Sequence, residues 1–85
     1  MYQIIPDPSI AEQVEALPRA ALVAYLELLA TLEVAPWNGP PQSAANPEGA
    51  VRRWAFGPGL AGQVIYLVMD ADREVHLLLV QWFGE

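Results

Sequence analysis

The chain has no cysteine, no lysine and a single histidine among its 85 residues. Without cysteine it can form neither disulfides nor thiolate metal sites. A single histidine and no cysteine supply too few of the usual ligands for a metal centre, so we expect no metal and no cofactor. The chain contains four arginines and ten acidic residues, which gives a formal net charge of −6. A field of that sign repels phosphate backbones, so nucleic-acid binding would need a local patch built from very few arginines.

Long apolar runs are also missing. No stretch approaches the roughly 20 apolar residues that a membrane-spanning helix needs. The opening MYQIIPDPS lacks a basic segment and is interrupted early by prolines, which is unlike a signal peptide. We therefore expect a soluble cytoplasmic protein that has no membrane partner.

Apolar residues are nevertheless abundant, at 54% of the chain. Soluble domains usually contain roughly 45–50%. A chain of this length forms one small domain, residues 1–85, and buries only about 60–65% of its unfolded surface. Because the interior is so small, we expect part of the apolar surface to lie in an interface, and a homo-oligomer is one way to form it.

The first half of the chain predicts one short strand and two helices. The segment YQII (2–5) is typical of a strand, and Asp7 or Ser9 can cap the helix that follows. Pro18 separates the two helices, and the connection between them is so short that they should form an antiparallel hairpin. Pro36 ends the second helix. Helical spacing relates Ile10, Val14 and Leu17 in the first helix, and Leu22, Leu26, Leu29 and Leu32, beside Tyr25, in the second.

The second half predicts a loop and three strands. Four prolines and two glycines mark residues 36–49 as a loop, and strands are expected over residues 50–56, 63–70 and 74–82. The last strand is apolar on both faces, which is typical of a central position in a sheet. The order β-αα-βββ predicts an α+β fold, in which the helical hairpin lies on one face of an antiparallel sheet whose last three strands form a meander.

Three motifs in this order resemble a known family. APWNGPPQ follows the second helix where that family has a Pro-aromatic-x-Gly turn, and GAVRRW resembles the start of its second strand with paired basic residues. VIYLVMDADREVHLLLVQW resembles its last two strands around an acidic turn. On these motifs, nearly the whole chain resembles the RelE/ParE toxin superfamily of bacterial type II toxin–antitoxin systems.

The resemblance implies a cytoplasmic toxin that a cognate antitoxin neutralises by wrapping its surface. The RelE branch inhibits translation by cleaving mRNA on the ribosome: it positions a 2′-hydroxyl for attack on the adjacent phosphate, and basic side chains stabilise the developing charge. The ParE branch poisons DNA gyrase. The chain is thus expected to be toxin-like, either as an RNA-binding endoribonuclease or as a relative without catalysis that acts as a protein-interaction module or homodimeric domain.

The candidate catalytic residues are Arg52, Arg53 and His76. Arg52 or Arg53 matches the basic position of the family's second strand, and only one of them can face a cleft, because neighbours on a strand point to opposite faces. If Arg52 does so, Trp54 shares its face and offers a stacking surface for a base; if Arg53 does, Trp54 belongs to the core. Histidine exchanges protons near neutral pH, so His76 is either a proton-transfer group or a core or sheet-edge histidine.

Other matched positions depart from the family pattern. Gln63 stands where the family has a third-strand arginine, and it can donate a hydrogen bond but supplies no positive charge. The closing QWFGE covers the family's C-terminal basic positions, and Glu85 is its one ionisable group. Tyr66 matches a strand tyrosine for which we expect a structural role. The candidate substrate-binding residues are Trp54, Gln63, Arg73 and Trp82.

Overall fold

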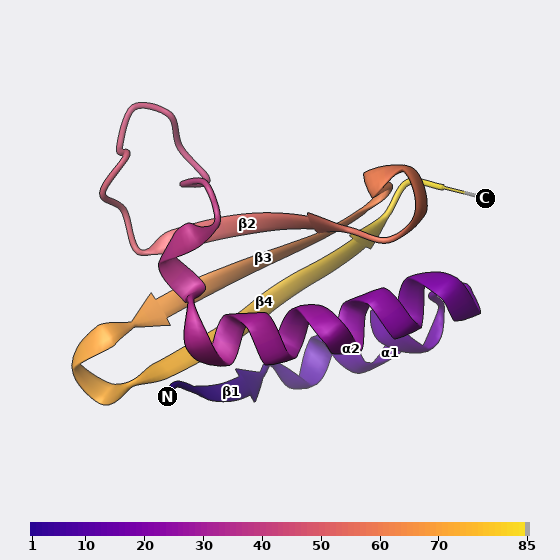
Figure 1. Ribbon diagram of the computed structural model, residues 1–85, viewed down its shortest axis with the longest axis horizontal. Coiled ribbons are helices and arrows are strands. Elements are labelled where there is room, and N and C mark those ends of the chain that lie inside the picture. Colours follow the sequence, from indigo (N-terminus) through magenta and orange to yellow (C-terminus); the bar gives the residue numbers. More distant parts are fainter. Residues whose placement is uncertain (85) are drawn as a thin grey trace.

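The computed structural model describes residues 1–84; Glu85 lies outside the described residues. A four-stranded sheet carries two α-helices on one face (Figure 1). Within residues 1–84, no helix is long and apolar enough to cross a membrane. The α+β class and the order β-αα-βββ are as the sequence predicts. The elements are β1 (Gln3–Pro6), α1 (Ala11–Glu15), α2 (Arg19–Val34), β2 (Val51–Phe56), β3 (Gly62–Met69) and β4 (Glu74–Trp82).

The strands lie in the order β1-β4-β3-β2. The central position expected for the last strand is confirmed, because β4 pairs with both β1 and β3. The expectation of a wholly antiparallel sheet is wrong, since β1 runs parallel to β4. The Tyr2 N–H donates to the Glu33 carbonyl at 2.8 Å, so α2 ends where β1 begins. The meander therefore starts from that same end, and its third strand runs in the direction of β1.

The two helices of the hairpin differ greatly in length, with five residues in α1 and 16 in α2. The side chain of Asp7 accepts the Ser9 N–H at 2.8 Å and caps a short 3-10 turn, after which α1 spans only five residues. The stripe that the sequence singled out is correct in part: Tyr25 and Leu32 are buried, and Leu22 and Leu29 are partly buried against the core. Leu26 is instead 55% exposed. Apolar side chains occur around most of α2, so periodicity alone could not select the side that packs. The buried side consists of Ala21, Tyr25, Leu28 and Leu32.

The core fills the space between the helices and the sheet. Its sheet side is formed by β-branched and aromatic residues, which suit a pleated surface. The β3–β4 pairing shifts register between Ile65 and Tyr66. Near this irregularity, the side-chain oxygen of Gln13 on α1 accepts the Val80 N–H at 2.7 Å. A backbone donor is thereby satisfied, and α1 is fastened to β4. The fully buried side chains of the sheet are Val64, Tyr66, Val75 and Leu77.

Tyr66 ties the sheet to the segment that follows α2. Its ring is fully buried, and its hydroxyl donates to the Pro36 carbonyl at 2.6 Å. Burial raises the pKa of Tyr66 to about 12, although the nearby charge of Arg52 acts in the opposite direction. Gly39 passes so close that an added Cβ would lie 2.6 Å from the Arg53 carbonyl oxygen and would also overlap the Tyr66 hydroxyl. The structural role expected for Tyr66 matches this arrangement.

Replacing Gly39 with alanine tests this close approach. The methyl group would collide with backbone and with a buried ring, so Gly39→Ala should lower the free energy of unfolding by about 1–3 kcal/mol. The neighbouring Asn38→Ala removes an exposed side chain and should change it by less than about 0.5 kcal/mol. Urea denaturation of both variants measures the difference; equal stability of the two would contradict the packing described.

Candidate functional site

Strand register sorts the predicted site residues onto two faces. Trp54 pairs with Val64 and lies on the helix side, where Phe56 is buried. Trp82 also packs against the core, and its buried indole N–H finds no hydrogen-bond partner within residues 1–84. Arg53 pairs with Ile65 on the opposite face, which the helices leave uncovered. Of the two faces that the sequence left possible for the arginine pair, the structure therefore gives the helix side to Arg52 and the open side to Arg53.

Arg52 is committed to structural contacts. Only 9% of the residue is exposed, and its guanidinium lies 4.9 Å from the centre of the Trp37 ring. Nε donates to the Gly49 carbonyl at 3.0 Å, Nη1 to that of Gly39 at 3.1 Å and Nη2 to that of Pro47 at 3.0 Å. Each of the three nitrogens donates to the loop 39–49, so three of the five guanidinium N–H groups are used, and the group lies buried among these carbonyls.

The same loop covers part of the outer edge of β2. The Arg53 N–H donates to the Pro40 carbonyl at 3.0 Å, and the Gln42 N–H donates to the Val51 carbonyl at 2.9 Å. An isolated bridge between Pro41 and Arg52 completes this short pairing. Exposed strand edges invite unwanted pairing, so the loop protects β2 while Arg52 holds the loop.

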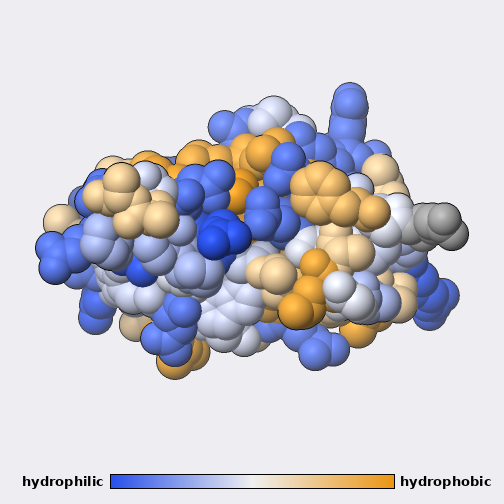
Figure 2. Space-filling view, turned by 90° about the horizontal axis from the view of Figure 1, so that it is seen from above, coloured by the Kyte–Doolittle hydropathy of each residue, from blue (hydrophilic) through white to orange (hydrophobic). Residues whose placement is uncertain are grey.

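The uncovered side of the sheet, here named the open face, brings together three predicted site residues. Arg53, Gln63 and His76 all lie on it by register. Its other members are mostly apolar. Figure 2 looks onto the β2 edge of the sheet, where hydrophobic and hydrophilic residues are interspersed at the surface. The open face consists of Gln3, Ile5, Val51, Arg53, Ala55, Gln63, Ile65, Leu67, Met69, Glu74, His76, Leu79 and Gln81.

The polar groups of the open face differ in how they are engaged. The Gln63 amide donates to the Gln81 side-chain oxygen at 3.1 Å, and His76 Nε2 lies 3.0 Å from Glu74 Oε1. The guanidinium of Arg53 is exposed and has no hydrogen bond or ion pair within residues 1–84. Arg53 and His76 belong to strands two positions apart and to different rungs, so their Cα atoms are roughly 12 Å apart. The face presents one free cation rather than a cluster of charges.

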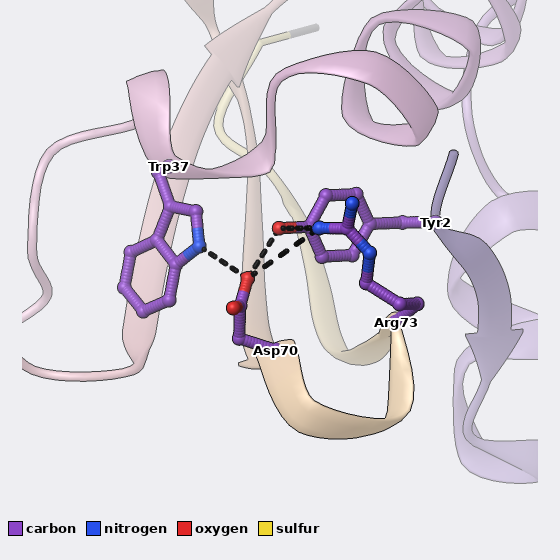
Figure 3. Close-up of polar contacts among 4 residues, drawn as sticks. All are labelled: Tyr2, Trp37, Asp70 and Arg73. Carbon is purple, nitrogen blue, oxygen red and sulfur yellow. Dashed lines mark hydrogen bonds and ion pairs between the residues drawn. The ribbon is translucent and has the colours of Figure 1, made fainter.

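Arg73 lies elsewhere, in a polar cluster at the end of the sheet (Figure 3). Asp70 Oδ1 accepts hydrogen bonds from the Tyr2 hydroxyl and, at 3.1 Å, from Trp37 Nε1. Arg73 Nη1 donates to the Tyr2 oxygen at 3.0 Å and lies 4.0 Å from Asp70 Oδ1. This end cluster, formed by Tyr2, Trp37, Asp70 and Arg73, joins the N-terminus, the segment after α2 and the β3–β4 turn.

The end cluster also continues to Arg52, because the Trp37 ring that stacks on Arg52 donates its N–H to Asp70. The Tyr2 hydrogen bond, and then those of Trp37 and the charge of Arg73, lower the pKa of Asp70. Sequence reasoning did not select Tyr2, Trp37 and Asp70 for this role. The acidic turn was visible, but Tyr2 is 68 positions away in the chain. Within residues 1–84, no group of three or more acidic or histidine side chains is placed to hold a metal ion.

Truncating each arginine of the pair separates the two roles. Arg52→Ala leaves three carbonyls without their charged donor and should lower the free energy of unfolding by about 2–4 kcal/mol. Arg53→Ala removes an exposed side chain and should change it by no more than about 0.5 kcal/mol. Chemical denaturation gives both values. Comparable effects of the two substitutions would contradict the assignment of Arg52 to the loop.

The end cluster should make the free energy of unfolding depend on pH in the acid range. Because the pKa of Asp70 is lower in the folded chain than its ordinary value of 3.8, the stabilisation is complete above that value and is lost as the pH falls through the lowered pKa. Asp70→Asn should therefore flatten the fall in unfolding free energy between about pH 4 and pH 2. Denaturation curves across this range measure the slope.

Two further variants serve as controls for the acid dependence. Tyr2→Phe removes the principal donor to Asp70 and should flatten the same slope. The pKa of Asp7 is lowered separately, by its hydrogen bonds from Ser9, so the effects of Asp7→Asn and Asp70→Asn should add. A slope that Asp70→Asn leaves unchanged would show that the end cluster does not stabilise the folded state in this way.

Known structures share the fold of this chain, although its sequence matches no known family. No family model and no curated protein matches the sequence. Among solved structures, the isolated RelE toxin of E. coli matches 100% of this chain and 87% of its own, with a TM-score of 0.78 at 11% identity. A chain of the archaeal RelE–RelB complex from Pyrococcus horikoshii OT3 matches 99% of this chain and 97% of its own length, with a TM-score of 0.70 at 18% identity. The fold of this chain is therefore that of the RelE toxins.

Proposed function

We propose that this protein is the toxin-like component of a bacterial type II toxin–antitoxin system and that it acts by binding its target rather than by cutting RNA. The RelE fold, matched across the whole chain, supports the toxin-like role. One of the matched structures is a RelE–RelB complex, which supports a cognate antitoxin as partner. The working surface of the proposal is the open face, since the helices cover the opposite side of the sheet.

The observation that carries the binding role is the engagement of Arg52. Cleavage of RNA through a 2′-hydroxyl needs a base, an acid and positive charge on the phosphate, each worth on the order of 10²–10⁴ in rate. Burial of Arg52 leaves Arg53 as the one arginine on the open face. His76 is paired with Glu74, and Gln63 with Gln81. A net charge of −6 adds long-range repulsion from nucleic acid.

The apolar part of the open face suits a protein target. Leu79 and Ile65 share the rung of Arg53, and Leu67 shares the rung of His76. Leu67 and Leu79 are partly exposed, whereas Ile65 is only 7% exposed. Interfaces of this kind place aliphatic surface at the centre and a few arginines where they can form specific ion pairs. Arg53 would then pair with a carboxylate of the target instead of with a phosphate.

Ribosome-dependent mRNA cleavage is the second candidate function, favoured by the presence of Arg53 and His76 on one face. In this reading the free guanidinium of Arg53 neutralises the phosphate, and His76, oriented by Glu74, transfers the proton of the attacking hydroxyl. This candidate function lacks a second cation to stabilise the phosphate charge, because position 63 is a glutamine. Its signature is RNA cleavage that requires both side chains.

Induced expression in a bacterial host tests the proposal. The soluble protein should arrest growth while mRNA stays uncut, and co-expression of the protein encoded by the neighbouring reading frame should restore growth. Arg53→Glu should abolish the arrest, whereas Arg53→Lys, which keeps the charge, should retain most of it. Thermal denaturation confirms that both variants fold.

The alternatives give distinct outcomes in the same experiment. New mRNA 5′ ends that disappear in both Arg53→Ala and His76→Ala would establish the ribonuclease and overturn the binding role. Normal growth with abundant soluble protein would contradict a toxin-like function altogether.

A further inference from the structure

The outer side of α2 carries an apolar stripe that nothing in residues 1–84 covers. Val23 is 50% exposed, Leu26 55% and Val34 70%, and Ala30 between them is exposed as well. At 3.6 residues per turn, this side lies directly opposite the buried side of the helix. Figure 1 shows α2 along the outside of the molecule, with the sheet behind it. A surface helix normally has polar residues in this position, so the stripe requires an explanation.

The spacing along this side is that of a helix–helix seam. Arg19, Val23, Leu26, Ala30 and Glu33 follow one another at intervals of four, three, four and three residues. Such alternation keeps side chains along one line, so they can interlock with those of a second helix. The small side chain of Ala30 allows the two backbones to approach. The part of the stripe with this spacing, named the α2 seam, consists of Val23, Leu26 and Ala30 with Arg19 and Glu33 at its ends.

We propose that the α2 seam binds the α2 seam of a second copy of this chain, with the two helices antiparallel. The charges select both the occupant and its direction. Arg19 lies at the first residue of α2, whereas Glu27 and Glu33 lie in its later half. Antiparallel pairing brings Arg19 of each copy beside the acidic half of the other, and the two-fold symmetry makes this contact twice. Parallel pairing would set Arg19 against Arg19 and oppose the two helix dipoles.

The expected dimer is weak and reversible. The seam covers about two heptads, so the interface is at the small end of specific protein contacts. Each protomer is already folded around its own core, and dimerisation therefore adds burial of the seam without a cost for ordering the helix. The open face of the sheet lies on the other side of the molecule, so the dimer leaves the proposed target-binding surface free. The inference is thus independent of the proposed function.

Sedimentation velocity on the full chain tests the proposal directly. The wild type should shift from monomer to dimer between roughly 1 μM and 1 mM, the range expected for a small interface. Leu26→Glu places carboxylates at the centre of the seam and should keep the protein monomeric throughout. Leu60→Glu makes the same chemical change at a residue that is 68% exposed and lies outside α2, and it should dimerise like the wild type.

Charge reversal tests the orientation. Arg19→Glu and Glu33→Arg should each weaken self-association by about tenfold, because both turn two attractive contacts into repulsive ones. An equimolar mixture of the two variants should associate about as tightly as the wild type, since each contact is again between opposite charges.

A wild type that remains monomeric at the highest concentration would overturn the proposal, and so would a dimer that Leu26→Glu leaves intact. If the wild type were monomeric and Leu26→Glu instead abolished binding of the neighbouring-frame protein, the seam would be a site for a different partner. Circular dichroism of every variant separates loss of association from loss of folding, and the wild-type result decides the matter even if a variant fails to fold.

Discussion

The burial of one guanidinium governs the rest of this structure. Removing an arginine from water costs several kcal/mol unless its donors are satisfied, and here three carbonyls of the loop 39–49 and the Trp37 ring satisfy Arg52. The loop is held against the edge of β2 as a result. Alternation along the strand then commits Arg53 to the opposite face. A pair of adjacent, chemically identical residues thereby acquires two unrelated roles.

The polar contacts at this end of the sheet form one continuous network. Trp37 links Arg52 to Asp70, and Asp70 holds Tyr2 and Arg73. The network binds together four segments: the first residues, the turn after α2, the loop and the β3–β4 turn. At the other end of the molecule the Val80 N–H depends on Gln13 in a similar way. In so small a domain, such contacts supplement a limited hydrophobic core.

The distribution of charge and apolar surface gives the molecule two distinct exterior faces. The open face combines aliphatic residues with the single free cation of Arg53, whereas the outer side of α2 combines aliphatic residues with charges of opposite sign at its two ends. The chain has the fold of the RelE toxins, with one arginine on the open face and apolar residues exposed on both sides of the molecule.

Local patterns in the sequence determined the element order, the central position of β4, a cap at Asp7 or Ser9 and the fold class, because each depends on residues close together in the chain. They also reduced the arginine question to two alternatives. Only the tertiary structure decided which arginine is buried, which side of the largely apolar α2 packs, and that β1 runs parallel to β4. Those outcomes depend on contacts between residues far apart in the chain: the carbonyls around Arg52, the sheet beneath Tyr25 and the junction of Tyr2 with Glu33. Periodicity shows which residues share a face of a helix or strand. Which of the faces is buried depends on the distant parts of the chain that pack against it.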